Sequence, residues 1–418
     1  AALFAHFHAL VEEQRGPAAG EQFIAITDEG TSLQRLAHER GFRCTFVNPS
    51  DIGGRYSALS YFGLVPAAIA GVDVGRLLDA GIAETDAARA PDADAVLLGA
   101  TLGEMALRGR DKCTFVASPG IAALGLWLEQ LIAESTGKHG RGILPVDAEP
   151  LGAPDAYAQD RLFVRLRLAG DGADEQDRAF RAIERDGQPI IEIALADARD
   201  LGREFFRWEF ATAIAGQVLG INPFDEPNVQ ESKDNTARVL KEFETSGRLG
   251  IDAAAGGGVT AINGSGVRRS LPDGLAELLA GLAPPRYFTI TAFIGQTPAT
   301  TDAFAAIRRL VRDATGAATT LGYGPRFLHS TGQLHKGGPP LGVFLQVTAD
   351  DLEDVAIPGK PWSFGQLKRA QAVGDAQSLI AHGRPILRVH LGADAYAGLE
   401  ALQRAVRAAI EAVAPAGR

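Results

Sequence analysis

Residues 112–132 read KCTFVASPGIAALGLWLEQLI, and this stretch decides the fold class. It begins with a short apolar run at residues 113–116, rich in β-branched and aromatic side chains, which is typical of a buried strand. A turn that contains proline and glycine follows, and apolar residues then recur at helical spacing over residues 121–132. A strand joined by a short turn to such a helix predicts one unit of a parallel α/β sheet.

The same alternation extends toward the N-terminus. Strand patterns occur at residues 23–26 and 44–47, and helical patterns at residues 32–40, 59–70 and 90–108. Short buried strands that alternate with helices predict a doubly wound parallel sheet, in which ligands bind at the carboxyl ends of the strands. The loops that follow the strands are therefore the expected positions of functional residues.

The second half of the chain repeats part of the first. Four short segments between residues 161 and 210 recur in the same order between residues 286 and 364. The pairs are 161–164 with 286–289, 179–183 with 303–307, 190–193 with 344–347, and 208–210 with 362–364. Four ordered matches predict a C-terminal α/β domain that is related to the first by an internal repeat. The Gly/Ala-rich residues 253–266 between the copies lack a preceding strand, which favours a flexible linker over a phosphate-binding loop.

Composition excludes several classes of protein. The chain has 418 residues, of which 46% are hydrophobic and 22% charged, with a formal net charge of −10. A fibrous or disordered chain does not have this composition, and the acidic balance argues against nucleic acid as a partner. The longest apolar run, near residues 62–72, is shorter than the ~20 residues of a membrane helix, so no membrane partner is expected.

The termini and the cysteines add further expectations. Cys44 and Cys113 are too few for a disulfide scaffold, and both lie in strand patterns, which favours buried free thiols. The first ten residues lack the features of a signal peptide, so a cytoplasmic location is expected. Met105 is the single methionine and position 1 is alanine, which predicts that the chain is a piece of a longer protein.

A first candidate loop is DIGGRYS (51–57), which follows the second strand pattern. Gly53 and Gly54 allow a ligand to approach the backbone closely, and the helix that follows offers free N–H groups. Arg55 adds a cationic fork, so the loop suits a phosphate or an oxyanion. The alternative is a tight turn with an exposed arginine and Ser57 as helix cap.

A second candidate is ESTGK (134–138), where Gly137 is expected to cap the helix over residues 121–132. Glu134 would lie at the negative end of the helix dipole, which raises the pKa of a carboxyl toward that of a general base. The alternative is an ordinary solvated glutamate on the surface.

Two later loops complete the set. GINPFDEP (220–227) leaves one helix and starts another that carries Lys233, although lysines on helix surfaces are normally inert. GPRFLHSTGQLHKGG (324–338) combines glycines, histidines and polar side chains, which predicts a binding loop. His329 and His335 have no cysteine near them in sequence, so neither a zinc pair nor any other metal site is expected.

Together these motifs resemble the glucose-6-phosphate isomerase family. NPSDIGGRYS (48–57) with FGLVP (62–66) is similar to the family's Gly-Gly-Arg signature, and ESTGKHGRGILP (134–145) to the bacterial loop that bears the catalytic glutamate. The segment from residue 220 to Lys233 resembles the C-terminal signature, with Lys233 at the position of the active-site lysine. The region after residue 284, with WSFGQL (362–367), resembles the isomerase half of fusions between transaldolase and glucose-6-phosphate isomerase.

The resemblance implies sugar-isomerase (SIS) subdomains and the interconversion of glucose 6-phosphate and fructose 6-phosphate without a cofactor. It implies that Glu134 moves the proton between C2 and C1, that His329 and Lys233 serve ring opening, and that Arg55 stabilises the cis-enediolate. A sugar phosphate would be bound by Gly53, Gly54, Arg55, Ser57 and Gln333. The implied domains are a remnant of the first SIS subdomain (1–20), the second SIS subdomain and isomerase core (21–250), a linker (251–284) and a C-terminal α/β domain (285–418).

The chain departs from the family in two respects. The Ser/Thr-rich phosphate loop of the first SIS subdomain is absent, which predicts that it lies upstream of residue 1. The family's ring-opening histidine follows the glutamate loop in an LHS-x-GQ motif, whereas residues 152–157 here contain no histidine. A similar string, LHSTGQ (328–333), lies in the second copy instead. Because the family's histidine comes from the other subunit of a dimer, His329 from the internal copy could replace it, in a monomer or a homodimer.

Two other functions are compatible with parts of the sequence. A non-catalytic SIS module that senses sugar phosphates would need the glycine-rich loop without the set of Glu134, Lys233 and Arg55. Transaldolase chemistry needs a Schiff-base lysine in a (β/α)₈ barrel, for which this chain has no room, although such activity could lie upstream.

Overall fold

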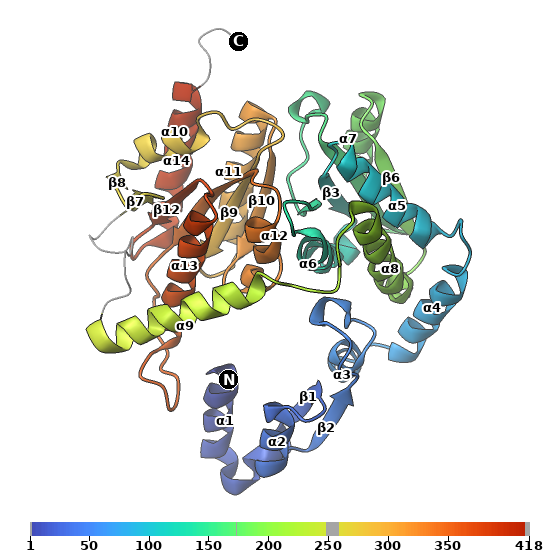
Figure 1. Ribbon diagram of the computed structural model, residues 1–418, viewed down its shortest axis with the longest axis vertical. Coiled ribbons are helices and arrows are strands. Elements are labelled where there is room, and N and C mark those ends of the chain that lie inside the picture. Colours follow the sequence, from blue (N-terminus) through green and yellow to red (C-terminus); the bar gives the residue numbers. More distant parts are fainter. Residues whose placement is uncertain (1, 173, 248–258, 414–418) are drawn as a thin grey trace. The chain divides into compact units, whose positions relative to one another are not determined.

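The computed structural model describes residues 2–172, 174–247 and 259–413 (Figure 1). The chain divides into two compact units. Unit 1 comprises Ala1–Leu97, Asp197–Ala211 and Asp354–Gln366, and unit 2 comprises Leu98–Ala196, Thr212–Glu353 and Leu367–Arg418. The predicted domains followed the order of the sequence, whereas these units assemble from separated segments. Within the described residues, every helix falls short of the length or the hydropathy that crossing a membrane requires.

Unit 1 contains a parallel pair of strands, β1 (Ile24–Asp28) and β2 (Cys44–Asn48), in which Ile24 lies opposite Cys44. Both strands were predicted, but Cys44 is exposed because this sheet has only two strands, and only Cys113 is a buried thiol. Helices on this unit are α1 (Ala2–Arg15), α2 (Ser32–Glu39), α3 (Tyr61–Ile69) and α4 (Val74–Ala87). The division from unit 2 falls within α5 (Asp94–Leu107), α8 (Leu201–Leu219) and α13 (Phe364–Ala381).

Unit 2 holds two sheets. The first has the order β4-β3-β5-β6 and is parallel throughout. Its strands are β3 (Lys112–Ala117), β4 (Leu144–Val146), β5 (Arg161–Leu168) and β6 (Ile190–Leu195). The helices α6 (Leu124–Thr136) and α7 (Asp174–Arg185) connect these strands. The strand and the helix predicted from residues 112–132 are thus β3 and α6, whose apolar side chains Phe115 and Leu128 are buried.

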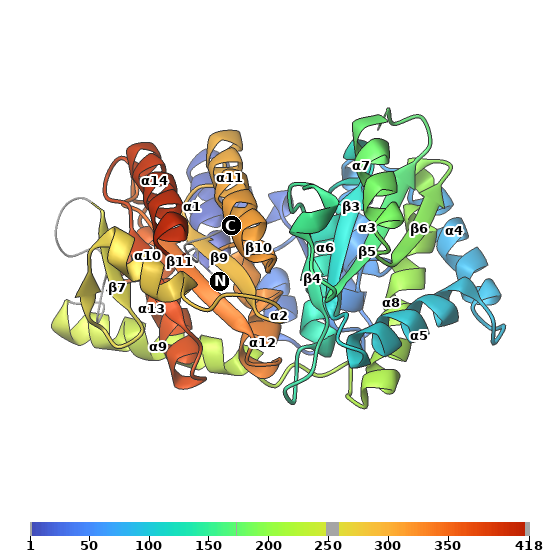
Figure 2. The ribbon, with the colours of Figure 1, turned by 90° about the horizontal axis from the view of Figure 1, so that it is seen from above.

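The second sheet has the order β10-β9-β11-β12-β7-β8, and its first four strands are parallel (Figure 2). These four are β9 (Tyr287–Phe293), β10 (Ala318–Tyr323), β11 (Gly342–Thr348) and β12 (Ile386–His390). The remaining helices here are α9 (Val229–Ser246), α11 (Pro298–Thr315), α12 (Gly332–Gly337) and α14 (Ala395–Val413). The predicted α/β class with parallel sheets is confirmed.

The stretch expected to be a linker differs from the prediction. Its described part forms β7 (Thr260–Asn263), β8 (Arg268–Arg269) and α10 (Leu271–Leu279), and β7 pairs antiparallel with β12. Ala261 of β7 and Leu275 of α10 belong to the buried apolar core of the second sheet. Most of that core comes from other strands and helices, so a few apolar side chains are enough to hold β7 and α10 in place. Residues 248–258, which include much of the Gly/Ala-rich segment, lie outside the described residues.

The two sheets share one topology. In each, the first strand is internal, the second lies at the edge, and the third and fourth extend to the other side, so β3, β4, β5 and β6 correspond to β9, β10, β11 and β12. The short sequence matches instead paired β5 with β9 and β6 with β11. Each of these pairings is shifted by one position across the sheet. Buried apolar strands followed by helices resemble one another, so short matches cannot distinguish neighbouring units. The two sheets therefore repeat one strand order, but the pairing of elements that the sequence matches predicted is wrong.

Candidate functional site

Glu134 lies near the C-terminal end of α6. Its side chain is buried, and the Nε2 atom of Gln130 donates a hydrogen bond to its Oε2 at 3.2 Å. The helix ends at Gly137, where a Cβ atom would lie 2.4 Å from the Cα of Leu334. Only glycine permits this approach, so the end of α6 packs directly against the segment 324–338.

Gln333 fastens that segment to α6 and to α9. Its side chain is 1% exposed. The Nε2 atom donates to the carbonyl of Gly137 and to Oδ1 of Asn228, both at 2.9 Å, and Oε1 accepts from the backbone N–H of Asn228 at 2.9 Å. Sequence comparison suggested substrate binding, but both amide atoms are engaged within the protein. Gln333 therefore acts here as a clamp between elements.

A second contact joins the same segment to α6. The short 3₁₀ helix that precedes Ser330 packs against α6, and the hydroxyl of Ser330 donates to the carbonyl of Phe327 within the segment. His329 is the residue next to Ser330, at the end of the short helix η6 (Arg326–His329). The segment that carries His329 therefore lies against α6, the helix that carries Glu134.

Lys233, the third predicted residue, acts on the pKa of His329. Partial burial, followed by the charges of Lys233 and Lys336, lowers the pKa of His329 below its usual value. Lys233 lies in the second turn of α9 and is exposed, and His329 is partly covered by protein but still reached by solvent. At neutral pH the imidazole is therefore mostly uncharged and can accept a proton. The 3₁₀ helix that ends at His329 contacts both α6 and α9, so the elements that carry Glu134, His329 and Lys233 adjoin one another in unit 2.

Two motifs that are distant in sequence meet through Lys138. Its ammonium is fully buried and lies 2.6 Å from Oδ1 of Asp225, with a hydrogen bond of 2.8 Å to the carbonyl of Asn222. Arg141 donates to the carbonyl of Leu219. The loop after α6 thereby fixes the loop that leads into α9 and Lys233. Sequence analysis did not assign Lys138 and Asp225, although both lie inside the two quoted motifs.

The end of the segment 324–338 is structural. His335 is buried between the rings of Phe327 and Phe344, and burial together with the charges of Lys336 and Arg384 lowers its pKa to about 3. Arg384 donates to the carbonyls of His335, Lys336 and Gly338 at 2.9–3.0 Å. Among the described residues, no three His, Cys, Asp or Glu side chains lie together as metal ligands would.

The remaining candidates belong to unit 1. A Cβ atom on Gly53 or Gly54 would meet no atom within 4 Å, so the backbone there is open to approach. The guanidinium of Arg55 lies 5.4 Å from the ring centroid of Tyr56. The hydroxyl of Ser57 donates to the carbonyl of Gly54 at 2.6 Å, which closes the turn. Ser57 does not cap α3, because that helix has Ser60 as its N-cap.

Known proteins with similar sequences are glucose-6-phosphate isomerases. No protein-family model matches the chain. The enzyme of Heliobacterium modesticaldum is 32% identical over 261 residues, which cover 52% of this chain and 58% of the relative. That of Leptospira biflexa is 30% identical over 259 residues, covering 52% and 57%. That of Listeria monocytogenes is 29% identical over 272 residues, covering 55% and 60%.

The chain thus spans less than two thirds of the length of these relatives, and over about half of its own length it is distantly homologous to them. Among solved structures, a glucose-6-phosphate isomerase from Chlamydia trachomatis has a TM-score of 0.45 and 18% identity, over 57% of this chain and 56% of that one. The C-terminal domain of a glucosamine-fructose-6-phosphate aminotransferase from Francisella tularensis has a TM-score of 0.24 and 10% identity, over 81% and 94%. Likenesses this weak carry no argument about the site.

Proposed function

We propose that the chain is an aldose–ketose isomerase that interconverts glucose 6-phosphate and fructose 6-phosphate. The observation that carries the proposal is the packing of the His329 segment against α6, where Gln333 donates to the carbonyl of Gly137 just after Glu134. The distant homology to glucose-6-phosphate isomerases supports the same reaction. Fusion to a transaldolase and a missing N-terminal segment stay predictions from the sequence.

In this proposal the residues of unit 2 move protons. His329 and Lys233 open the sugar ring, and the lowered pKa of His329 keeps its imidazole available as an acceptor. Glu134 then removes the proton from C2 and returns it to C1. Its place on a helix whose end is clamped by Gln333 keeps the carboxylate in a fixed position.

The glycine-rich turn of unit 1 supplies the electrostatic part. Arg55 stabilises the cis-enediolate, whose negative charge develops only along the reaction path. Gly53 and Gly54 let the sugar approach the backbone, since no atom occupies the space beside them.

We also propose that His329 replaces a histidine that the first half lacks. The loop between β10 and β11 contains His329, whereas the equivalent loop between β4 and β5 contains no histidine. The internal copy then provides the histidine that the family takes from a second subunit, and one chain carries both Glu134 and His329.

The test is a coupled isomerase assay on the 418-residue chain, together with NMR detection of solvent deuterium at C1 and C2 of the sugar. The Glu134→Gln variant should lose about 10²- to 10⁴-fold in kcat, as expected for a missing general base, and the exchange should disappear. Glu104→Gln, at an exposed position on α5, is the matched control. Sugar-phosphate binding without turnover or exchange by the wild-type chain would instead identify a non-catalytic binding module.

A further inference from the structure

A cavity of about 500 Å³ lies at the carboxyl end of the first sheet of unit 2. It is lined by the end of β3, by the loop that follows β4 (residues 147–152), and by side chains of α7 and α11. Pockets that bind small molecules have volumes of about 300–1,000 Å³, and in parallel sheets they lie at the carboxyl ends of the strands. The cavity therefore has the size and the position of a ligand site.

The cavity lies at the opposite end of α6 from Glu134. Ala122, which lines it, comes just before the first turn of α6, and Glu134 follows twelve residues later. At 1.5 Å per helical residue, these two positions are about 18 Å apart along the helix. The described residues that line the cavity do not include Glu134, Lys233 or His329. The cavity is therefore distinct from the candidate catalytic site.

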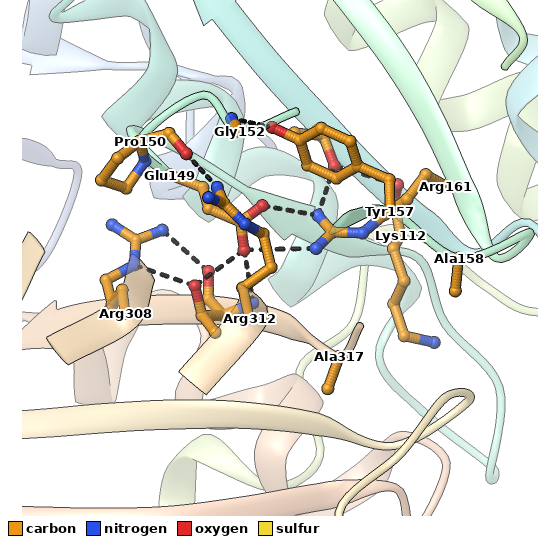
Figure 3. A network of polar contacts seen from close by, with 12 residues as sticks. Lys112, Glu149, Pro150, Gly152, Tyr157, Ala158, Arg161, Arg308, Arg312 and Ala317 are labelled. Atoms are coloured by element: carbon orange, nitrogen blue, oxygen red, sulfur yellow. Dashed lines mark hydrogen bonds and ion pairs between the residues drawn. The ribbon is translucent and has the colours of Figure 1, made fainter. Parts of the chain in front are cut away.

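Two buried arginines of α11 hold the loop after β4 (Figure 3). Arg308 donates to the carbonyls of residues 147 and 148 at 2.9 Å each. Arg312, one turn later, donates to the carbonyl of Pro150, and its own charge is balanced by an ion pair of 2.6 Å with Asp313. The loop that lines the cavity is thus fixed by side chains from a distant part of the sequence.

The carboxylate of Glu149 ties the same loop to two strands. It accepts from the backbone N–H and the hydroxyl of Thr319 on β10, both at 2.7 Å, and forms an ion pair of 3.0 Å with Arg161 on β5. At the end of the loop, the N–H of Gly152 donates to the hydroxyl of Tyr157 at 2.7 Å. Glu149 is therefore engaged within the protein, and it shapes the cavity instead of binding a ligand.

The backbone of Ala148 is strained. Its φ is 48°, in the left-handed region, where the Cβ atom of an alanine crowds the backbone carbonyl. The side chain is exposed, so its burial does not offset this strain, and the hydrogen bond from Arg308 to its carbonyl holds the conformation. Residues held in this way are concentrated at functional sites and ligand clamps. The loop therefore has the preformed shape that a ligand site requires.

The polar groups of the lining restrict the chemistry of the ligand. Asp147, Gln176 and Arg309 contribute a carboxyl, an amide and a guanidinium. Burial raises the pKa of Asp147 to about 6, so at neutral pH this carboxyl is mostly ionised and accepts hydrogen bonds. An apolar ligand would remove water from these groups without replacing its hydrogen bonds. The ligand must therefore carry hydrogen-bond donors.

The charges around the cavity favour an anion. The loop carries two carboxyls, Asp147 and Glu149, and they are balanced by the two guanidiniums bound to the loop, those of Arg308 and Arg161. Arg309, at an exposed position on α11, adds one positive charge to the lining. An ammonium group would meet a carboxyl whose charge is already offset, whereas an anionic group gains an arginine.

The start of α6 does not offer a second position for the anion. The N–H of Gly120, in the short helix η3 (Pro119–Ile121) that leads into α6, donates to the carboxylate of Asp171 at 2.7 Å. This carboxylate occupies the place that a phosphate takes at other helix N-termini. Arg309 is therefore the group that receives the anion.

We propose that this cavity is a second ligand site, which takes a small anion with several hydroxyl groups, the chemistry shared by sugar phosphates and sugar acids. The hydroxyl groups donate to Asp147 and exchange hydrogen bonds with Gln176, and the anionic group pairs with Arg309. The site does not rest on the proposed isomerase reaction, because it lies at the other end of α6 from Glu134.

Alanine methyl groups report directly whether the cavity is occupied. Ala122, Ala148 and Ala179 line it, whereas Ala133 is buried next to Glu134. Methyl NMR spectra of the 418-residue chain, labelled at alanine and assigned by single replacements with serine, are recorded during titrations with glucose 6-phosphate and with gluconate. At least one of these probes should shift all three cavity signals, and the one that binds more tightly identifies the sugar phosphate or the sugar acid as the ligand class.

The titrations also separate this proposal from the proposed function. Occupation of the catalytic site by glucose 6-phosphate should shift the Ala133 signal, and an unchanged Ala133 signal would count against the isomerase alone. Cavity signals that stay unchanged with both probes would overturn the second site. Equal shifts with inorganic phosphate or with glucose would also overturn it, because the proposed ligand needs both the charge and the hydroxyl groups.

Single substitutions test the assigned contacts. Gln176→Ala and Arg309→Gln should each weaken binding of the probe about 10-fold, since each removes a hydrogen-bond partner of the ligand. Lys241→Gln removes the same charge as Arg309→Gln from an exposed position on α9, and it should leave the affinity unchanged. Wild-type affinity in both cavity variants would contradict the assignment.

Discussion

Gln333 provides a sharp test of how unit 2 is held together. Gln333→Ala removes two donated hydrogen bonds and one accepted hydrogen bond, and it leaves the buried carbonyl of Gly137 without that donor. Each lost bond contributes about 0.5–1.5 kcal/mol, and a buried unsatisfied group costs about 1–3 kcal/mol. For three bonds and one unsatisfied carbonyl, the expected loss in unfolding free energy is about 3–7 kcal/mol.

Gln333→Glu keeps the length of the side chain and reverses the role of one atom. A carboxylate can still accept from the backbone N–H of Asn228, but it then faces the carbonyl of Gly137 and Oδ1 of Asn228, which are both acceptors. Protonation restores one donor, so the pKa of this carboxyl should be higher in the folded than in the unfolded state. The variant should therefore lose stability relative to wild type as pH rises from about 4 through that raised pKa.

The assay is urea unfolding followed by circular dichroism at pH 5 and pH 8. Gln217→Ala, at an exposed position on α8, is the matched control and should stay within about 0.5 kcal/mol of wild type. An unfolding free energy of Gln333→Ala equal to that of the control would refute the clamp. So would a Gln333→Glu variant whose loss is the same at both pH values.

Two further predictions concern stability. Gly137→Ala should lower the free energy of unfolding by about 2–4 kcal/mol, because its Cβ would lie 2.4 Å from the backbone of Leu334. The control Gly53→Ala meets no atom within 4 Å and should be nearly neutral. Equal losses of the two variants in urea unfolding would contradict the close packing. For Glu129, the folded-state pKa of about 8 exceeds the ordinary 4.5, so the wild type should lose several kcal/mol of stability relative to Glu129→Gln as pH rises from about 5 to 8. A stability difference that stays flat over this range would argue against a buried, mostly protonated carboxyl.

Local patterns predicted the elements whose signal is local. The strand at residues 113–116 and the helix at residues 121–132 became β3 and α6, since each carries its own periodicity of buried apolar side chains. The pattern of the Gly/Ala-rich region did not predict β7 and α10, because those elements are stabilised by a sheet built mainly from later residues.

For the candidate site, too, short local motifs were predictive, whereas contacts between distant segments were not. Glu134, Lys233 and His329 were predicted from short motifs, and the elements that carry them adjoin one another in unit 2, while their roles stay predictions. The contacts that hold them could not be named. Lys138 and Asp225 are far apart in sequence, and only their ion pair in the folded chain shows that the two motifs meet. Gln333 belonged to a recognisable motif, yet only its buried hydrogen bonds distinguish a clamp from a substrate contact.

The central claim is that one chain supplies both Glu134 and His329 to a single isomerase site. The most direct measurement mixes the inactive variants Glu134→Gln and His329→Ala, unfolds and refolds them together, and assays fructose 6-phosphate isomerisation. If each site is completed within its own chain, the mixture should stay as inactive as either variant alone. Recovery of turnover in the mixture would show that the two residues meet across different chains and would contradict the account.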